Sequence, residues 1–410
     1  MRLAYGIGGV DWQDRVDYPR MRKERLAKGQ AAMKKRGIAA CLLTRTDNIR
    51  YMTSVKGPFF ANQLRYALAF AEHDPVMYEL GDMLEHTRVH CTWIKPENWR
   101  FAHCWLNGIV GPEAARLEAK RFADAILRDL KDRGVHKEKL GVDSLDEVGK
   151  QALAEVGIET VGVMPALSEA RRTKTPDEVL VMRMAIAIAE SGYANLCETL
   201  RVGMRERDVG AAALAAITRA GAENAAAGVR SGPNTFEVYH SGNSDRIIEA
   251  GDLLYMNTCS TTFGGYRVCI YRSFIAGRKP NDKEKDWYKK CRDRVYDVIS
   301  EIKPGATTAQ AAKRFLPAST WGYEAEQRLL VAEVGHGIGM TYEEPVISRI
   351  FSLEHPQTFE PGMVIAVEAR EGTPGEGGVR LEEMVLVTDT GHEIMTHWPA
   401  DEIVPVGRVI

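Results

Sequence analysis

The sequence predicts an α+β protein with a smaller α/β domain over residues 1–170 and a larger α+β domain over residues 171–410. In the first part, helical and strand patterns alternate, which is typical of an α/β layer arrangement. In the second part, helical patterns group with short strands of antiparallel character, which indicates an α+β domain. Between them, Thr175 is a candidate helix N-cap, because Pro176 follows it at the first helical position.

In the first domain, the segment 21–36 is rich in Lys, Arg and Ala and predicts a helix that Gly37 ends. The apolar segment 38–43 predicts a buried strand. Further elements expected in this domain are strands over 66–71 and from 139 to 142 and a helix over 112–133. In the second domain the expected helices are 176–200, 205–220, 282–301 and 307–315, and the expected strands are 226–230, 253–257, 266–271, 363–369 and 383–388.

The composition is that of an ordinary globular protein, with 410 residues, 45% hydrophobic and 27% charged. A net charge of -2 gives no electrostatic reason to bind nucleic acid or an anionic membrane. No apolar run approaches the roughly 18–20 residues that span a bilayer, and the first residues do not resemble a signal peptide. The seven Cys are dispersed, which favours reduced thiols. We therefore expect a cytoplasmic protein that acts on a small molecule, without nucleic acid or membrane partners.

The most informative motif lies near the C-terminus. His336, Glu368 and Glu382 occupy short apolar segments that predict neighbouring strands. An earlier hairpin begins at Gly251-Asp252 and ends at Tyr271-Arg272-Ser273-Phe274. In this order the motifs resemble the pita-bread hydrolases, which include methionine aminopeptidase, prolidase, aminopeptidase P and creatinase. The resemblance covers nearly the whole chain and implies a C-terminal pita-bread domain, a smaller creatinase-type N-terminal domain, and a homodimer.

In the metallopeptidases of that family, two Asp of the hairpin, one His and two Glu hold two metal ions. By motif match, these five positions are Asn257, Cys269, His336, Glu368 and Glu382 here. Two neighbouring dications need bridging carboxylates, and Asn257 offers only a neutral oxygen. We therefore expect no metal cofactor. The alternative is one zinc or iron ion held by Cys269, His336, Glu368 and Glu382.

Two hairpin cysteines are each open to two interpretations. Cys259 and Cys269 are either thiolate ligands or nucleophiles, or small apolar residues that fill a buried strand. Without a metal, acid–base chemistry falls to histidines. His240 matches the catalytic base of creatinase, and His336 is expected to assist it.

Two carboxylates are expected to bind a cationic group of the substrate. They are Glu368, which matches a creatinase Glu, and Glu382, which falls where creatinase has a His. A second creatinase Glu falls at Tyr271, so the match to creatinase is partial. Tyr271 and Tyr342 are expected to line the substrate site. Tyr342 stands where the peptidases carry a second His, which argues against peptide-bond hydrolysis.

Two arginines are candidates for holding a substrate carboxylate, because the planar guanidinium pairs with a carboxylate through two hydrogen bonds. Arg65 lies where creatinase uses an Arg from the other subunit, and Arg349 follows the His336 segment. For both, a surface salt bridge is the alternative.

These residues predict a creatinase-like hydrolase that cleaves a C–N bond in a small zwitterionic carboxylate with a cationic nitrogen group. Three alternatives stay open. Loop lengths also resemble the dimethylsulfoniopropionate lyase of this fold, which would release an unsaturated acid. A one-metal Xaa-Pro peptidase would cleave proline dipeptides and be stopped by a chelator. An inactive binding module would have no chemical need for the retained His and Glu positions.

Overall fold

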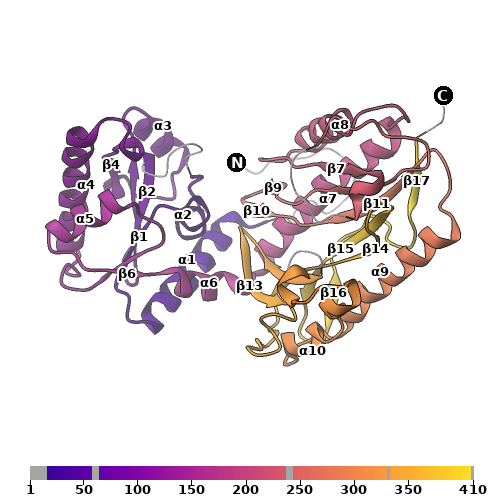
Figure 1. Ribbon diagram of the computed structural model, residues 1–410. Coiled ribbons are helices and arrows are strands. Elements are labelled where there is room, and N and C mark those ends of the chain that lie inside the picture. The colour runs from indigo at the N-terminus through magenta and orange to yellow at the C-terminus, as the bar shows by residue number, and fades with distance from the viewer. Residues whose placement is uncertain (1–15, 58–63, 237–242, 330–332, 408–410) are drawn as a thin grey trace, which may run out of the picture. The chain divides into compact units, whose positions relative to one another are not determined.

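The computed structural model describes residues 16–57, 64–236, 243–329 and 333–407. The chain divides into two compact units, one over Asp17–Arg171 and the other mainly over Arg172–Ile410. Figure 1 shows a sheet with helices in each unit.

The N-terminal unit is built on one six-stranded mixed sheet with the order β4-β3-β2-β1-β5-β6. Its strands are β1 (Ala40–Leu43), β2 (Arg65–Phe70), β3 (Val76–Glu79), β4 (Trp99–Phe101), β5 (Leu140–Val142) and β6 (Thr160–Gly162). Its helices are α1 (Tyr18–Lys35), α2 (Thr46–Thr53), α3 (Met83–His90), α4 (Pro112–Asp132), α5 (Glu147–Glu155) and α6 (Met164–Arg172), with short η2 (Pro96–Asn98) and η3 (Leu106–Gly108). The alternating pattern expected from the sequence is confirmed.

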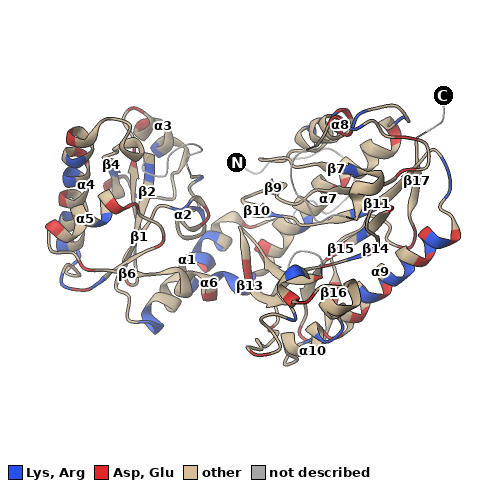
Figure 2. Ribbon diagram, in the orientation of Figure 1, with Lys and Arg blue, Asp and Glu red and all other residues tan. Residues whose placement is uncertain are grey.

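The core of this unit lies between the sheet and α4. Phe122, Ile126 and Leu130 recur at helical spacing on α4 and are buried in one cluster with Leu42 of β1. Polar residues cover the other side of α4, and Figure 2 shows charges of both signs along it. The amphipathic pattern of the segment therefore positions the helix on the sheet.

The C-terminal unit contains two larger sheets, with the orders β17-β11-β8-β7 and β13-β12-β14-β15-β16, and the small pair β9–β10. Its strands are β7 (Gly228–Ser231), β8 (Leu253–Asn257), β9 (Thr262–Phe263), β10 (Tyr266–Arg267), β11 (Tyr271–Ala276), β12 (Val334–Ile338), β13 (Tyr342–Ile347), β14 (Val364–Thr373), β15 (Gly377–Val387), β16 (His392–Ile394) and β17 (Val404–Val406). Its helices are α7 (Pro176–Thr199), α8 (Glu206–Arg219), α9 (Asp282–Ser300) and α10 (Thr308–Ala312), with η4 (Gly232–Thr235), η5 (Ala318–Trp321) and η6 (Glu326–Leu329). The α+β prediction is confirmed.

Helix α7 starts as the sequence predicts. Thr175 accepts a hydrogen bond from the Glu178 backbone, and the Glu178 carboxylate accepts one from the Thr175 backbone, which completes a capping box. Among the described residues, α7 is also the helix that is long and apolar enough to cross a membrane, a property that buried core helices share.

The expected strand over 266–271 is wrong. The chain leaves β10 after Arg267 and enters β11 only at Tyr271. The register of the hairpin shifts by one residue between the pair Asn257–Tyr271 and the pair Thr262–Arg267, and Ser260, with a left-handed φ of 76°, lies within this shift. Cys259 and Cys269 therefore lie in an irregular connection and not within a strand.

The hairpin of β14 and β15 is longer than expected, because β15 already begins at Gly377. The reason is that these strands bury charged residues. Arg370, Arg380 and Glu382 are each no more than 2% exposed. A search for apolar runs therefore ends such strands too early. The long hairpin positions the carboxylates described below.

Glu333 anchors the chain just before β12. Its carboxylate accepts a hydrogen bond from Arg294 of α9 at 2.6 Å and another from the Leu316 backbone at 3.1 Å. Burial raises the pKa of Glu333 to about 7, against the opposing effect of Arg294. A carboxyl with a raised folded-state pKa contributes stability below its unfolded pKa and loses it as the pH rises through about 7.

We expect the thermal midpoint of the wild-type protein to fall more between about pH 5 and about pH 8 than that of Glu333→Gln, because the amide does not titrate. Thermal unfolding at a series of pH values measures this. Parallel curves for the two proteins would show that Glu333 does not titrate in this range.

Candidate active site

Three adjacent strands bring the predicted site residues together. β12, β14 and β15 are neighbours in one sheet, as the sequence predicts. Glu368 of β14 and Glu382 of β15 are direct cross-strand partners. His336 of β12 places its Nε2 3.7 Å from Oε1 of Glu382. The structure therefore assembles one His and two Glu in one place.

The two carboxylates are buried and close to each other. Glu382 is 0% exposed and Glu368 is 6% exposed. Burial and the neighbouring Glu382 raise the pKa of Glu368 well above its usual range. Within the described part of the chain, Oε1 of Glu382 has no hydrogen-bond partner. A buried carboxylate oxygen without a partner is costly, so this position favours a cation or a donor group.

Arg380 is a site residue that the sequence reasoning missed. Its Nη1 lies 3.4 Å from Oε2 of Glu368, and its guanidinium lies over the rings of Tyr255 and Tyr271. Arg380 stands two residues before Glu382 on one strand, and such residues share a face. That spacing was the available signal. Arg380 pairs with Glu368, whereas the group of opposite charge nearest to Glu382 among the described ion pairs is His336, and only when that histidine is protonated.

His336 is oriented by its own backbone neighbour. Its Nδ1 contacts the Gly337 carbonyl oxygen at 3.2 Å, and because a carbonyl only accepts, Nδ1 carries the proton in this contact. Nε2 is then the nitrogen that can take a proton, with Oε1 of Glu382 placed to stabilise the resulting imidazolium. The Tyr342 ring meets the His336 ring edge-on at a centroid distance of 4.6 Å.

Both predicted site tyrosines border this cluster. The Tyr342 hydroxyl lies 4.0 Å from Sγ of Cys269, and that neighbouring thiol raises the Tyr342 pKa although the residue is 58% exposed. Burial likewise raises the pKa of Tyr271, which is 1% exposed and pairs with Asn257 across the β8–β11 ladder. Both hydroxyls therefore stay protonated at neutral pH and can donate hydrogen bonds.

The two hairpin cysteines meet beside Glu382. Cys269 donates its S–H to Cys259 with the sulfur atoms 2.8 Å apart, and Cys259 lies 3.6 Å from Oε2 of Glu382. Both thiols are free. Burial raises the pKa of Cys259 to about 11, and the bond to Cys259 together with burial raises the pKa of Cys269 well above its usual range. Neither thiol is a ready nucleophile at neutral pH.

The donor set fits one soft divalent ion and does not fit two ions. The donor atoms of Cys259, Cys269 and Glu382 all lie within 4.8 Å of one another. This set shares Cys269 and Glu382 with the one-metal set expected from the sequence, adds Cys259, and does not include His336 or Glu368, the latter being engaged by Arg380. A second ion would have to rely on Asn257, whose amide carries no charge to neutralise it.

The arginines expected to hold a carboxylate are both engaged. In the N-terminal unit, Arg65 is buried and donates to Glu79 at 2.6 Å, to Thr87 at 3.2 Å and to the Lys56 carbonyl oxygen. The surface salt bridge considered for Arg65 is thus a buried one. Arg349 donates to Glu326 at 3.2 Å and borders a small cavity beside η6. His240 lies outside the described residues.

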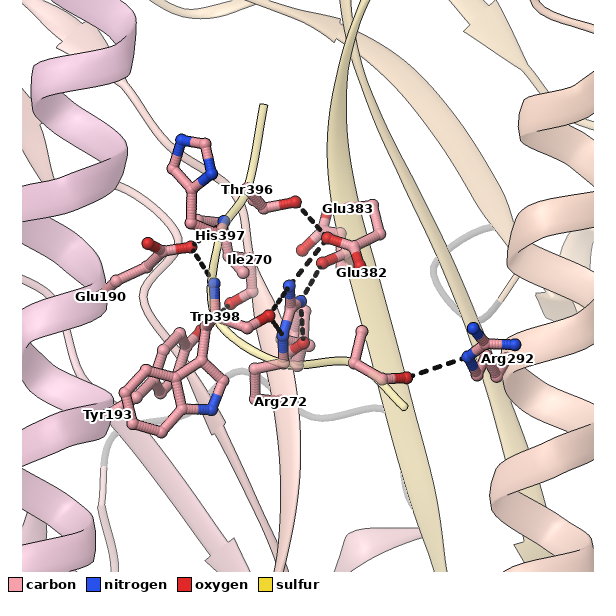
Figure 3. A network of polar contacts seen from close by, with 12 residues as sticks. Glu190, Tyr193, Ile270, Arg272, Arg292, Glu382, Glu383, Thr396, His397 and Trp398 are labelled. Carbon is pink, nitrogen blue, oxygen red and sulfur yellow. Dashed lines mark hydrogen bonds and ion pairs between the residues drawn. The ribbon is translucent and has the colours of Figure 1, made fainter. Parts of the chain in front are cut away.

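A second polar network supports β15 from behind the site (Figure 3). Arg272 of β11 donates to the Glu383 carboxylate at 2.7 Å and to the Glu382 carbonyl oxygen at 2.6 Å. Thr396 also donates to Glu383, and the Trp398 carbonyl oxygen accepts from Arg272. Successive side chains of a strand point to opposite faces of the sheet. Glu382 therefore faces the site, and Glu383 points to the opposite face, where it binds Arg272.

The two sheets, the hairpin and the His–Glu–Glu cluster define a hydrolase of the pita-bread class. The chain belongs to metallopeptidase family M24, whose model matches residues 181–389. Within that family the two-metal donor set is altered here, as described above.

Curated relatives carry several activities. The uncharacterized peptidase YqhT of Bacillus subtilis is 28% identical over 255 residues, which are 60% of this chain and 68% of that protein. The dimethylsulfoniopropionate lyase DddP of Roseovarius nubinhibens is 26% identical over 301 residues, which are 69% of this chain and 65% of that protein. A creatinase of Bacillus sp. is 25% identical over 303 residues, which are 68% of this chain and 71% of that protein. The chain thus spans about two thirds of each relative.

Among solved structures, an Xaa-Pro dipeptidase from Bacillus anthracis superposes with a TM-score of 0.75 at 22% identity. The match covers 94% of this chain and 100% of that one. At this identity the likeness shows the fold, and the activity has to be argued from the site.

Proposed function

We propose that this protein hydrolyses a non-peptide C–N bond in a small zwitterionic compound that carries a carboxylate and a cationic nitrogen group, without a pair of metal ions. The observation that carries the proposal is the unpartnered, fully buried Oε1 of Glu382 between Glu368 and His336. Burial and Glu382 raise the pKa of Glu368, and a cationic group of the substrate lowers it again, so that both carboxylates can be ionised beside Arg380 and the cation.

The same residues can carry out the chemistry. Nε2 of His336 takes a proton from water while the water oxygen bonds to the amidinium-type carbon. The C–N bond then breaks, and His336 returns the proton to the leaving nitrogen. Glu382 stabilises the imidazolium and, with Glu368, holds the cationic group. His240 remains a proposed second base, and Arg349 remains a proposed carboxylate partner because its Nη2 donates to none of the described residues.

We extend the proposal to the localisation, oligomeric state and partners of the enzyme. We place it in the cytoplasm as a homodimer that acts on a small molecule and needs neither nucleic acid nor a membrane. The homodimer rests on the resemblance of the sequence to creatinase.

One observation favours a second candidate. The Cys259, Cys269 and Glu382 donors lie close enough to hold one ion, and a one-metal Xaa-Pro peptidase would use such an ion. The sequence similarity to a dimethylsulfoniopropionate lyase makes lyase activity a third candidate, and its product would be an unsaturated acid.

The test is a product analysis in the presence of a chelator, with guanidino acids, amidino acids, dimethylsulfoniopropionate and Xaa-Pro dipeptides as substrates. We expect hydrolysis of a guanidino or amidino acid. We also expect a loss of about 100-fold or more in His336→Asn, since general base catalysis is worth about 10²–10⁴. His392→Asn is the matched control, because Nδ1 of His392 also contacts a backbone carbonyl.

Release of an unsaturated acid from the sulfonium compound would identify a lyase instead. Release of proline that stops with the chelator would identify the peptidase.

A further inference from the structure

We propose that Cys259, Cys269 and Glu382 form a binding site for one thiophilic divalent cation such as Zn²⁺, and that this ion competes with the cationic group of the substrate. The metal site is inferred from the positions of its donor atoms and does not depend on the proposed function. The competition rests on the proposed function, in which Glu382 receives the substrate cation.

The geometry points to one ion. The two sulfur atoms and a carboxylate oxygen of Glu382 all lie within 4.8 Å of one another, and the sulfur atoms are 2.8 Å apart. Glu382 is completely buried, and its Oε1 has no hydrogen-bond partner in the described part of the chain. A cysteine pair that only filled space would pack among apolar side chains, whereas this pair borders a charged group.

The donor chemistry selects the ion. Two sulfurs and one carboxylate oxygen suit Zn²⁺ and other soft or borderline ions, whereas Mg²⁺ and Ca²⁺ prefer oxygen ligands alone. Three protein ligands leave one position of a tetrahedral zinc open. Nε2 of His336, 3.7 Å from the other Glu382 oxygen, lies next to the cluster.

Binding requires a small local change. Sulfurs that each lie about 2.3 Å from a tetrahedral ion are farther apart than 2.8 Å, so the S–H contact between the cysteines must open. Both cysteines lie in the irregular connection between β8 and β11. The residues on either side are paired across this connection, through the bonds from the Thr258 backbone to Ile270 and from the Ser260 backbone to Val268, each 3.0 Å long. The opening therefore has to come from rotation of the two cysteine side chains, which leaves these backbone bonds in place.

Glu382 makes the two occupants mutually exclusive. One carboxylate cannot coordinate a dication and neutralise an amidinium at the same time, because the ion removes the negative charge that the substrate needs. Zinc is therefore expected to act on this enzyme as an inhibitor.

The binding test uses the full-length protein purified without a metal-affinity tag and freed of metal by a chelator. Titration with Co²⁺ reports sulfur ligation through the thiolate-to-cobalt charge-transfer absorption, and calorimetry with Zn²⁺ reports stoichiometry. We expect about one ion per chain. The absorption should disappear in Cys259→Ser and in Cys269→Ser. It should persist in Cys291→Ser, which alters another free buried thiol. Thermal melting checks that each variant is folded.

A wild-type protein without the charge-transfer absorption, or with the same absorption in all three variants, would overturn the site. Inhibition is measured on the guanidino or amidino acid that the enzyme hydrolyses. We expect Zn²⁺ to raise the apparent KM of the wild-type protein, and the rate of Cys259→Ser, whatever its value, to stop responding to zinc.

Activation by Zn²⁺ would overturn the competition and the metal-free reaction together. Zinc binding in a protein that hydrolyses none of the tested compounds would leave the metal site standing and refute the proposed function alone.

Discussion

Glu382→Gln is expected to lower kcat/KM for C–N hydrolysis by about 100-fold or more, because an amide can neither neutralise a substrate cation nor stabilise the His336 imidazolium. The protein should stay folded. Oε1 of Glu382 has no hydrogen-bond partner to lose, and removing its charge relieves the repulsion with Glu368. Steady-state kinetics and thermal melting measure the two effects, and we expect a melting temperature equal to or above that of the wild type.

Glu383→Gln is the matched control, since it makes the same chemical change one residue further along the strand. Glu383 accepts from Arg272 at 2.7 Å and from Tyr296 at 3.1 Å, away from the site. This variant should melt at a lower temperature and keep most of its kcat/KM. Equal losses of activity in both variants would show that Glu382 acts only through the scaffold.

Arg272→Met is expected to reduce the free energy of unfolding by about 3–5 kcal/mol, the range found when one partner of a buried ion pair is removed. The side chains of Arg272 and Glu383 are each 2% exposed. Without Arg272, the Glu383 carboxylate is therefore left buried without its partner and cannot reach water. Arg272 also donates to the carbonyl oxygens of Glu382 and Trp398, which ties β11 to β15 (Figure 3). Urea unfolding measures the loss.

The double variant Arg272→Met with Glu383→Leu should recover much of that stability, because no buried charge is left without a partner. If the losses of the two single variants simply add in the double variant, the pair is not coupled and the assigned role of this network is wrong.

Several parts of this architecture could be read from the sequence, and the reasons differ. Apolar periodicity located α4 and β8 closely, and the Thr175 capping box located the start of α7. The site residues His336, Glu368 and Glu382 came from motif order, and the prediction that their strands are neighbours is confirmed.

Other parts depend on geometry that a sequence does not display. The meeting of Cys259 with Cys269 depends on the pairing register of β8 with β11, which continues beyond Asn257 and Tyr271 through the bond from the Thr258 backbone to Ile270. The pairing of Arg65 with Glu79 depends on the register of β2 with β3. Buried charges such as Arg380 interrupt the hydrophobic pattern, so the strand that carries the site was predicted to be too short and Arg380 itself was missed.

We propose that this M24 site no longer holds a pair of divalent ions. The most direct test is equilibrium dialysis of the catalytically active protein against excess Mn²⁺ or Zn²⁺, with the bound metal counted by plasma mass spectrometry. The donor set predicts essentially no bound Mn²⁺ and at most about one Zn²⁺ per chain, because Asn257 cannot neutralise a second ion. Two ions per chain, with an activity that requires both, would show that the site is still dinuclear.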